Sequence, residues 1–436
     1  MRADVVVIGS GPAGLSAARA AAAAGVQVVV VEEAPWAGGR LACRVDTLDS
    51  PPALAGRRAD QAARELVAAA GAAGATIETG TLAWGLFPGA PGTVAVRRDG
   101  RVEAVEAGAV VVATGSLPAP YPFTGWTLPG VMTAPAVERL INRHGFLPGR
   151  QAVVVGDTSE AGRVARLLEL CGAAVEQVQD IESAGGQGRV EEVTVGGQTR
   201  PADLVVLAVG RLPQVELLNA AGCPIGADGV PQHDPSTGRT PLVGVFVAGS
   251  AGGAGNLAMS IGSGAIAGIS AAEHVGALTR AEAAARRWDL IRQLPPPARL
   301  SAPERPLPVD EFALVCRCEE IPRTEVEDAI RAGARTVDDV KRMTRCGMGF
   351  CQGKNCTRTV MNLLALRGAA TRGQAGSGAA APGGPLRPDR PGAVELRPMR
   401  LRPPVRPVRL GELAAAGRDV SLLERAIHPE GEEPHP

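Results

Sequence analysis

The chain has 436 residues, of which 45% are hydrophobic, so it is long and apolar enough for two or three domains with buried cores and is not globally disordered. Its 45 basic and 45 acidic side chains cancel, which removes any overall electrostatic reason to expect nucleic-acid binding and leaves membrane contact peripheral at most. The sequence has no run long enough for a membrane span. The short apolar run after Met1 leads directly into a glycine loop, so we expect a cytoplasmic protein.

Strand and helix patterns alternate through the first part of the chain. A buried strand at 4–8, an Ala-rich helix at 13–24 and a strand at 26–31 have the length of one βαβ unit. The further elements that we expect in this part are a helix at 59–70 and strands at 75–78, 93–97 and 109–113. The alternation is typical of an α/β fold.

A second unit of the same kind begins at residue 152, so the chain contains an approximate internal repeat. We expect strands at 152–156, 174–178, 192–195, 204–209 and 243–248, and helices at 160–170 and 256–275. The Pro-rich stretch 294–308 is typical of a linker. After Gly368 the chain becomes a Pro- and Arg-rich tail, which we expect to be either solvated and disordered or an arm that lies on a partner subunit.

The first glycine loop has the sequence Gly9-Ser10-Gly11-Pro12-Ala13-Gly14, placed between a strand and a helix. The glycines allow a tight turn, close approach of a pyrophosphate and close helix–strand packing. Pro12 and Ala13 begin the helix, whose N-terminus offers free N–H groups to phosphates. Glu32 ends the second strand, where a carboxylate binds an adenosine ribose and repels a 2′-phosphate. The loop therefore favours FAD or NAD over NADP.

Three later segments favour FAD over NAD. Gly38-Gly39-Arg40 follows the acidic residue and offers a second backbone approach along the cofactor. The strand at 110–113 ends in Thr114-Gly115. The strand at 243–248 ends in Gly249-Ser250, where the ribityl chain and inner phosphate would lie. We therefore predict that the cofactor-binding residues are Gly9, Gly11, Pro12, Ala13, Gly14, Glu32, Gly39, Arg40, Thr114, Gly115, Gly249 and Ser250.

Together these segments resemble the flavoproteins with two dinucleotide-binding domains, in which an NAD-type domain is inserted into an FAD domain. This resemblance implies a Rossmann-like α/β fold. In that family an Asp follows the last Ala-Gly pair, whereas this chain has Ser250, which is a weaker hydrogen-bonding group for the ribityl chain. We expect an FAD-binding domain at 1–120 and 243–290, an inserted domain at 121–242 and a linker at 291–310.

The second glycine loop, Gly156 to Gly162, departs from a dinucleotide-binding fingerprint. Thr158 replaces the middle glycine and Ala161 the third, and Asp157 and Glu160 add negative charge beside a pyrophosphate. We expect a retained fold with no nicotinamide cofactor. The alternative is a modified site for NAD(P)H or another adenine nucleotide.

Five of the eight cysteines lie between residues 316 and 356, which indicates metal binding in a cytosolic chain. A Cys-x-Cys pair and a second pair with four residues between its cysteines, joined by a helical hairpin at 322–332 and 337–344, can supply the four thiolates of an iron–sulfur cluster. Zinc is the alternative metal. A last helix is expected at 357–366. Cys43, Cys171 and Cys223 are expected to be packed thiols, and no catalytic residue is identified.

The cysteine segment closely resembles the [2Fe–2S] domain of the bacterioferritin-associated ferredoxin type. The matching motifs are Cys-Arg-Cys-Glu at 316–319, Thr-Arg-Cys-Gly-Met-Gly at 344–349 and Cys-Gln-Gly-x-x-Cys at 351–356. By this resemblance the metal ligands are Cys316, Cys318, Cys351 and Cys356, and Cys346 is surplus. The small helical [2Fe–2S] domain is expected at 311–368 and the tail at 369–436.

The order of motifs is similar over nearly the whole chain to the A or alpha subunits of heteromeric amine and amino-acid dehydrogenases, such as opine oxidase, proline or hydroxyproline dehydrogenase and hydrogen cyanide synthase. The resemblance implies an oxidoreductase subunit that relays electrons between FAD and a [2Fe–2S] cluster. Its partner would be a flavoprotein subunit that oxidises a small amino acid or amine. The alternatives are a stand-alone NAD(P)H-dependent flavin reductase and a non-catalytic redox or iron sensor.

Overall fold

A computed structural model describes residues 2–296, 298–300, 313–373 and 396–416. The chain divides into two compact units. The first unit comprises residues 1–117, 211–301 and 401–436, and the second comprises residues 118–210 and 302–400. Residues 211–242, expected in the inserted domain, thus cluster with the first unit.

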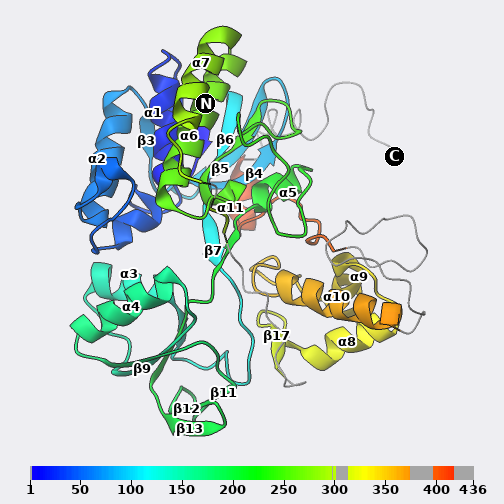
Figure 1. Cartoon of the computed structure of the whole chain (residues 1–436). Helices are drawn as coiled ribbons and strands as arrows, with labels where there is room; N and C mark the ends of the chain where they lie inside the picture. The colour runs from blue at the N-terminus through cyan, green and yellow to red at the C-terminus, as the bar shows by residue number, and fades with distance from the viewer. Residues whose placement is uncertain (1, 297, 301–312, 374–395, 417–436) are drawn as a thin grey trace. The chain divides into compact units, whose positions relative to one another are not determined.

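The first unit is built on one sheet of seven strands (Figure 1). They are β1 (Arg2–Ile8), β2 (Val28–Val31), β3 (Thr76–Glu78), β4 (Leu82–Phe87), β5 (Gly92–Arg98), β6 (Arg101–Val112) and β16 (Val245–Val247). Their order is β3-β2-β1-β6-β5-β4, and β16 also pairs with β6. Every residue of β2 and β16 is buried, which explains why the parallel strands are near-continuous runs of Val.

Strand β6 joins two kinds of pairing. Its residues 106–112 run parallel to β1, and its residues 101–107 pair with β5 in an antiparallel ladder. Of strand β6 the sequence predicted only residues 109–113, and strand β4 was not predicted. The reason is that the antiparallel part has partly exposed positions such as Glu103, so it lacks the continuous apolar run of a buried parallel strand.

Helices α1 (Pro12–Ala22) and α6 (Leu257–His274) lie side by side in the first unit (Figure 1). Their backbones approach so closely that a Cβ atom at Gly264 would lie 2.1 Å from the carbonyl oxygen of Ala13. A Cβ atom at Gly268 would lie 2.2 Å from that of Ala17. The Ala/Gly composition of both helices therefore serves a packing contact in which no larger side chain fits.

The other helices of the first unit are α2 (Ala59–Ala72), α5 (Glu216–Ala220), α7 (Arg280–Ile291), α11 (Leu410–Ala416) and the short 3₁₀ helices Gly39–Cys43, Pro52–Leu54 and Gly249–Gly252. Helix α7 was not predicted, although Thr279 and Glu282 form a capping box at its N-terminus.

No described helix has both the length and the apolar character that crossing a bilayer requires.

The second unit contains a four-stranded parallel sheet in the order β10-β9-β14-β8. Its strands are β8 (Val131–Thr133), β9 (Gln151–Val155), β10 (Ala174–Val178) and β14 (Leu204–Leu207), with helices α3 (Ala134–His144) and α4 (Ser159–Leu170). An antiparallel sheet consists of β11 (Ser183–Gly185), β12 (Glu192–Val195) and β13 (Gln198–Pro201). Strands β7 (Ser116–Pro118) and β15 (Arg211–Pro213), which pair with each other, lie where the chain passes between the two units in sequence. Strand β9 and helix α4 form the predicted second strand–turn–helix unit.

The cysteine module of the second unit consists of β17 (Leu314–Cys316), β18 (Ile321–Pro322), α8 (Arg323–Arg331), α9 (Val337–Thr344) and α10 (Thr357–Gly373). Helix α9 begins at a capping box in which Thr336 accepts a hydrogen bond from the N–H of Asp339. The indole N–H of Trp126 donates to the carbonyl of Leu314 at 2.8 Å. Most of the predicted linker lies outside the described residues.

The described part of the tail packs on its own chain. Met399 and Val405 are only 2% and 3% exposed. The N–H of Arg400 donates to Asp338 in the second unit, and the N–H of Val405 donates to the carbonyl of Trp84 in the first unit. Helix α11 follows. For residues 396–416 the expectation of a disordered tail is therefore wrong, because apolar side chains spaced along the Pro-rich segment are buried. The alternative of an arm that lies on a partner subunit stays a prediction.

Candidate functional site

The first glycine loop connects β1 to α1, and its three glycines have different surroundings. A Cβ atom at Gly9 would lie 2.5 Å from the oxygen of Ala113, and one at Gly14 would lie 1.8 Å from the oxygen of Gly9. At Gly11 a Cβ atom would have nothing within 4 Å. Packing within the chain thus explains Gly9 and Gly14 but not Gly11. Open space beside Gly11 fits the close approach of a cofactor pyrophosphate.

The N-terminus of α1 is available to an anion. Among the described residues no side chain caps this helix, whose N-cap is Gly11 and whose first residue is Pro12. Its first N–H groups therefore remain open to phosphate oxygens, and the helix dipole favours negative charge there. These features fit the diphosphate of FAD.

Glu32 holds the loop from the end of β2. One carboxylate oxygen accepts hydrogen bonds from the N–H and the hydroxyl of Ser10, at 2.9 and 2.7 Å. The other oxygen accepts from the N–H of Ala34 at 2.8 Å. A carboxylate has about four acceptor sites, so about one remains for a ribose hydroxyl. Sequence reasoning missed Ser10, although its place between two loop glycines was a signal.

The other predicted FAD segments converge on this loop. A Cβ atom at Gly39 would lie 2.8 Å from the Cα of Gly11, and one at Gly249 would lie 2.5 Å from the Cβ of Ala13. The Ala113 carbonyl that contacts Gly9 directly precedes Thr114 and Gly115. The structure therefore brings together the backbones of segments that lie far apart in the sequence.

The polar side chains of these segments make bonds within the chain. The hydroxyl of Thr114 donates to the carbonyl of Gln214 at 2.6 Å, and that of Ser250 donates to the carbonyl of Ala254 at 3.1 Å. Both hydroxyls keep lone pairs that can accept from a ligand. Arg40 is exposed on the 3₁₀ helix Gly39–Cys43. Ser263, which sequence reasoning missed, accepts from the N–H of Gly249 at 3.0 Å.

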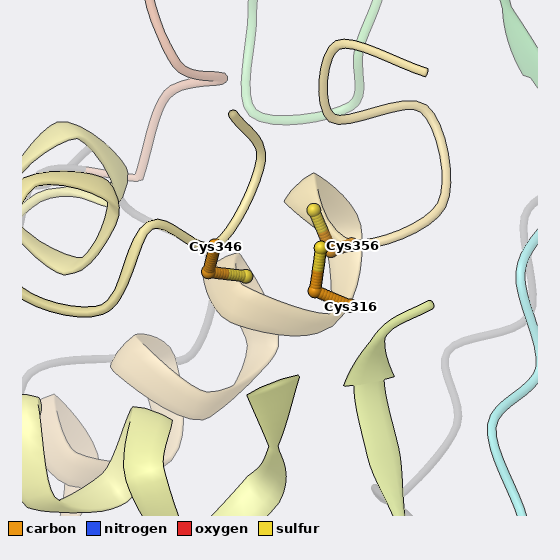
Figure 2. A group of neighbouring side chains, drawn as sticks. All are labelled: Cys316, Cys346 and Cys356. Carbon is orange, nitrogen blue, oxygen red and sulfur yellow. The ribbon is translucent and has the colours of Figure 1, made fainter. Parts of the chain in front are cut away.

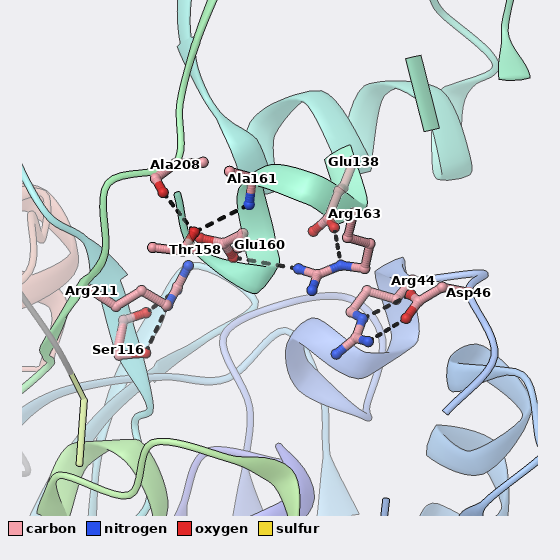
Figure 3. Close-up of polar contacts among 10 residues, drawn as sticks. All are labelled: Arg44, Asp46, Ser116, Glu138, Thr158, Glu160, Ala161, Arg163, Ala208 and Arg211. Carbon is pink, nitrogen blue, oxygen red and sulfur yellow. Dashed lines mark hydrogen bonds and ion pairs between the residues drawn. The ribbon is translucent and has the colours of Figure 1, made fainter. Parts of the chain in front are cut away.

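The second glycine loop has its helix N-terminus already occupied (Figure 3). The hydroxyl of Thr158 accepts from the N–H of Ala161 at 3.1 Å and donates to the carbonyl of Ala208 at 2.7 Å. The buried carboxylates of Glu160 and Glu138 lie close by, and both are within ion-pair distance of Arg163. The cap and the acidic charge disfavour an incoming pyrophosphate.

The five cysteines of the module come together in two sets. Cys316, Cys346 and Cys356 are buried, and their Sγ atoms all lie within 4.8 Å of one another (Figure 2). Cys318 and Cys351 are partly exposed and share a thiol hydrogen bond. The sequence placed Cys346 outside the ligand set, but the structure groups it with two predicted ligands. Outside the module, Cys43 and Cys223 are buried, whereas Cys171 is exposed, so the expected packing of this last thiol is wrong.

Hydrogen bonds at the module favour a thiolate at Cys316. The thiols of Cys346 and Cys356 lower the pKa of Cys316 by donating to its sulfur. Burial opposes this shift, and the N–H groups of Gly347 and Glu319 support it. Burial and the neighbouring Cys351 thiol raise the pKa of Cys318 to about 11. The three buried sulfurs lie close enough together to bind one cation, whose binding would release their protons.

The cysteine loop is enclosed by side chains from other segments. A Cβ atom at Gly347 would lie 2.3 Å from the Cε of Met399, and one at Gly349 would lie 2.3 Å from the Cβ of Cys318. The guanidinium of Arg317 lies 5.2 Å from the centre of the Trp126 ring. The Met399 thioether thus packs against the loop that carries the cysteines, and Trp126 packs against the segment that carries Arg317.

Comparison with known proteins identifies both parts. Residues 3–175 match the pyridine nucleotide-disulphide oxidoreductase family, and residues 314–365 match the BFD-like [2Fe-2S] binding domain. These matches confirm the predicted Rossmann-like flavoprotein fold with a small [2Fe–2S] domain, and the cofactors FAD and [2Fe–2S]. The zinc alternative is not supported.

The chain is similar to relatives over nearly its whole length. Among opine oxidase A subunits, that of Agrobacterium tumefaciens (strain Ach5) is 30% identical, with 94% of this chain and 91% of the relative covered. The HcnB component of hydrogen cyanide synthase from Pseudomonas aeruginosa is 28% identical, with 80% and 90% covered. The crystal structure of L-proline dehydrogenase from P. horikoshii matches with a TM-score of 0.79 at 25% identity, over 95% of this chain and 79% of that one.

Proposed function

Because the chain belongs to the family of opine oxidase A subunits, we propose that it is the FAD- and [2Fe–2S]-containing subunit of a heteromeric dehydrogenase for small amines or amino acids. One observation carries this proposal: a single chain combines an open FAD-type glycine loop with a buried sulfur-lined site. When bound, the flavin accepts two electrons and the cluster passes them on one at a time. Opine, proline or hydroxyproline and glycine-type substrates are the candidates.

Each predicted region has a role in this proposal. Residues 1–120 and 243–290 bind FAD, with the N–H groups of α1 on the diphosphate and Glu32 on the ribose. Residues 311–368 hold the cluster through Cys316, Cys318, Cys351 and Cys356. The module positions these sulfurs and excludes water. A partner flavoprotein subunit oxidises the substrate. A cytoplasmic location is part of the proposal, and the eight free thiols support it.

The test is anaerobic spectroscopy of the chain purified with and without its partner subunit. The flavin absorbance and the electron paramagnetic resonance (EPR) signal of the cluster would be recorded before and after addition of amino-acid substrates or NADH. We expect flavin bleaching and a reduced-cluster signal with substrate, only when the partner is present. Rapid bleaching of the isolated chain by NADH would instead establish the stand-alone reductase. An isolated chain without flavin would point to a sensor.

A further inference from the structure

The module holds one more thiol than a [2Fe–2S] cluster needs. Such a cluster takes four cysteine sulfurs, two on each iron. The outer pair, Cys318 and Cys351, is joined by a thiol hydrogen bond and would supply the two ligands of one iron. The other iron then has three candidates, because Cys316, Cys346 and Cys356 all lie within mutual reach (Figure 2). We refer to these three residues as the inner cysteines.

Local structure directs Cys346 at the other inner cysteines. Helix α9 ends at Arg345, which has a left-handed backbone with φ of 64° and turns the chain sharply. The N–H of Cys346 then donates to the hydroxyl of Thr344 at 3.1 Å, which itself donates to the carbonyl of Val340 at 2.7 Å. Cys346 is 1% exposed, and its sulfur points toward the other two (Figure 2).

A cysteine that only fills space has different surroundings. Cys223, for example, is packed among apolar side chains of the first unit's core. Cys346 instead makes thiol hydrogen bonds to Cys316 and Cys356. Its sulfur therefore lies in the ligand set, within reach of any cation that the inner cysteines hold.

We propose that Cys346 is a reserve ligand, which replaces Cys356 or Cys316 at the inner iron but cannot replace Cys318 or Cys351. In the exchange Cys346 loses its S–H proton to water, and its sulfur forms the iron bond that the missing thiolate would have made. No electron is transferred. The inference depends on the cluster and not on the identity of the substrate.

The experiment compares full-length variants purified anaerobically. Cys346→Ala should keep a native EPR spectrum and iron content, because the four predicted ligands remain. Cys356→Ala should keep most of its iron and sulfide but show shifted g-values, since one sulfur comes from a new direction. The double variant Cys356→Ala/Cys346→Ala should contain about tenfold less cluster than Cys356→Ala, because only three thiolates remain to bind it.

The matched control removes an outer ligand. Cys351→Ala should lose the cluster to the same extent whether or not Cys346 is present, because Cys346 belongs to the inner set. Flavin content and circular dichroism show whether each variant is folded. If Cys356→Ala misfolds, the single variants Cys356→Ser, Cys316→Ala and Cys316→Ser replace it as tests of the inner cysteines.

Three results would overturn the proposal. The first is loss of the cluster in every folded inner single variant. The second is loss of the cluster in Cys346→Ala alone, which would make Cys346 an ordinary ligand. The third is an equal rescue of Cys351→Ala by Cys346, which would remove the distinction between the two sets. Because all readouts are spectroscopic, they are independent of whether the complex oxidises an amine.

Discussion

Single residues distinguish the two glycine loops, although both connect a parallel strand to a helix. At Gly11 the helix has no side-chain cap among the described residues, and the space beside the glycine is open. At Thr158 the side-chain hydroxyl accepts a hydrogen bond from the N-terminal turn of α4, where a ligand oxygen would otherwise accept it. A threonine side chain in place of a glycine hydrogen thus caps the helix N-terminus that an anion would otherwise use.

Glu32 provides a test of the FAD loop at this scale. Glu32→Ala removes the acceptor for two N–H groups and one hydroxyl, which leaves buried donors unsatisfied. We expect a loss of about 1–3 kcal/mol in stability and a clear fall in the flavin-to-protein ratio. Absorption spectra after gel filtration and thermal denaturation measure both. Glu33→Ala is the control, because Glu33 is exposed and its ion pair with Arg406 is worth little. Equal flavin loss in both variants would refute the assigned role.

Among the elements, helix α9 sets the position at which the cysteine loop 346–356 begins. Its capping box joins Thr336 and Asp339, and its C-terminal turn delivers Cys346. Thr336→Ala should cost about 1 kcal/mol, whereas Thr336→Ser, which keeps the hydroxyl, should cost less. Thermal loss of the visible circular dichroism of the cluster measures the difference. Identical curves for the two variants would contradict the capping role.

The same box has a defined pH dependence. Burial raises the pKa of Asp339, but hydrogen bonds from Thr336 and the N–H of Arg335 outweigh it, so the pKa lies below its ordinary value of 3.8. The folded state therefore favours the carboxylate, and this stabilisation is present above that value and is lost as the pH falls through the lowered pKa. We expect the difference between Thr336→Ala and the natural chain to shrink below about pH 4. A difference that grew at acid pH would contradict this linkage.

The contact between α1 and α6 is a second test at this scale. Gly268→Ala would push a methyl group against the Ala17 carbonyl at 2.2 Å, so the helices must separate. We expect a loss of about 1–3 kcal/mol in urea denaturation. Gly71→Ala in α2 is the control, because the added Cβ atom would meet nothing within 4 Å. This substitution should stabilise the helix by about 0.5–1 kcal/mol. The same effect in both variants would argue against close helix packing.

At the scale of the whole molecule, the end of the chain contributes to the folded core. Val405 is buried in a cluster of the first unit that also contains Leu86 and Val94. Val405→Asp should destabilise the protein by about 2–5 kcal/mol and shift the fluorescence of the neighbouring Trp84 to longer wavelength. Leu410→Asp should change neither, because Leu410 is 83% exposed. If Val405→Asp were as stable as Leu410→Asp, the tail would not be part of the core.

Several parts of the fold could be predicted from local sequence pattern alone. The βαβ units, the glycine loops and the all-cysteine ligand chemistry follow from spacing and residue type, because turns, helix starts and thiolate ligands depend on residues that are near one another in the sequence. Those features were enough for the α/β fold class and for FAD. The resemblance to a known ferredoxin domain was needed to choose a [2Fe–2S] cluster over zinc.

The contacts between residues far apart in the sequence could be identified only in the folded chain. It placed Cys346 with Cys316 and Cys356, gave the Thr158 hydroxyl a partner at Ala208, and buried Val405 against the strand that contains Trp84. These contacts join positions that share no periodicity. Their formation depends on how whole elements pack around a core, and no local pattern in the chain carries that information.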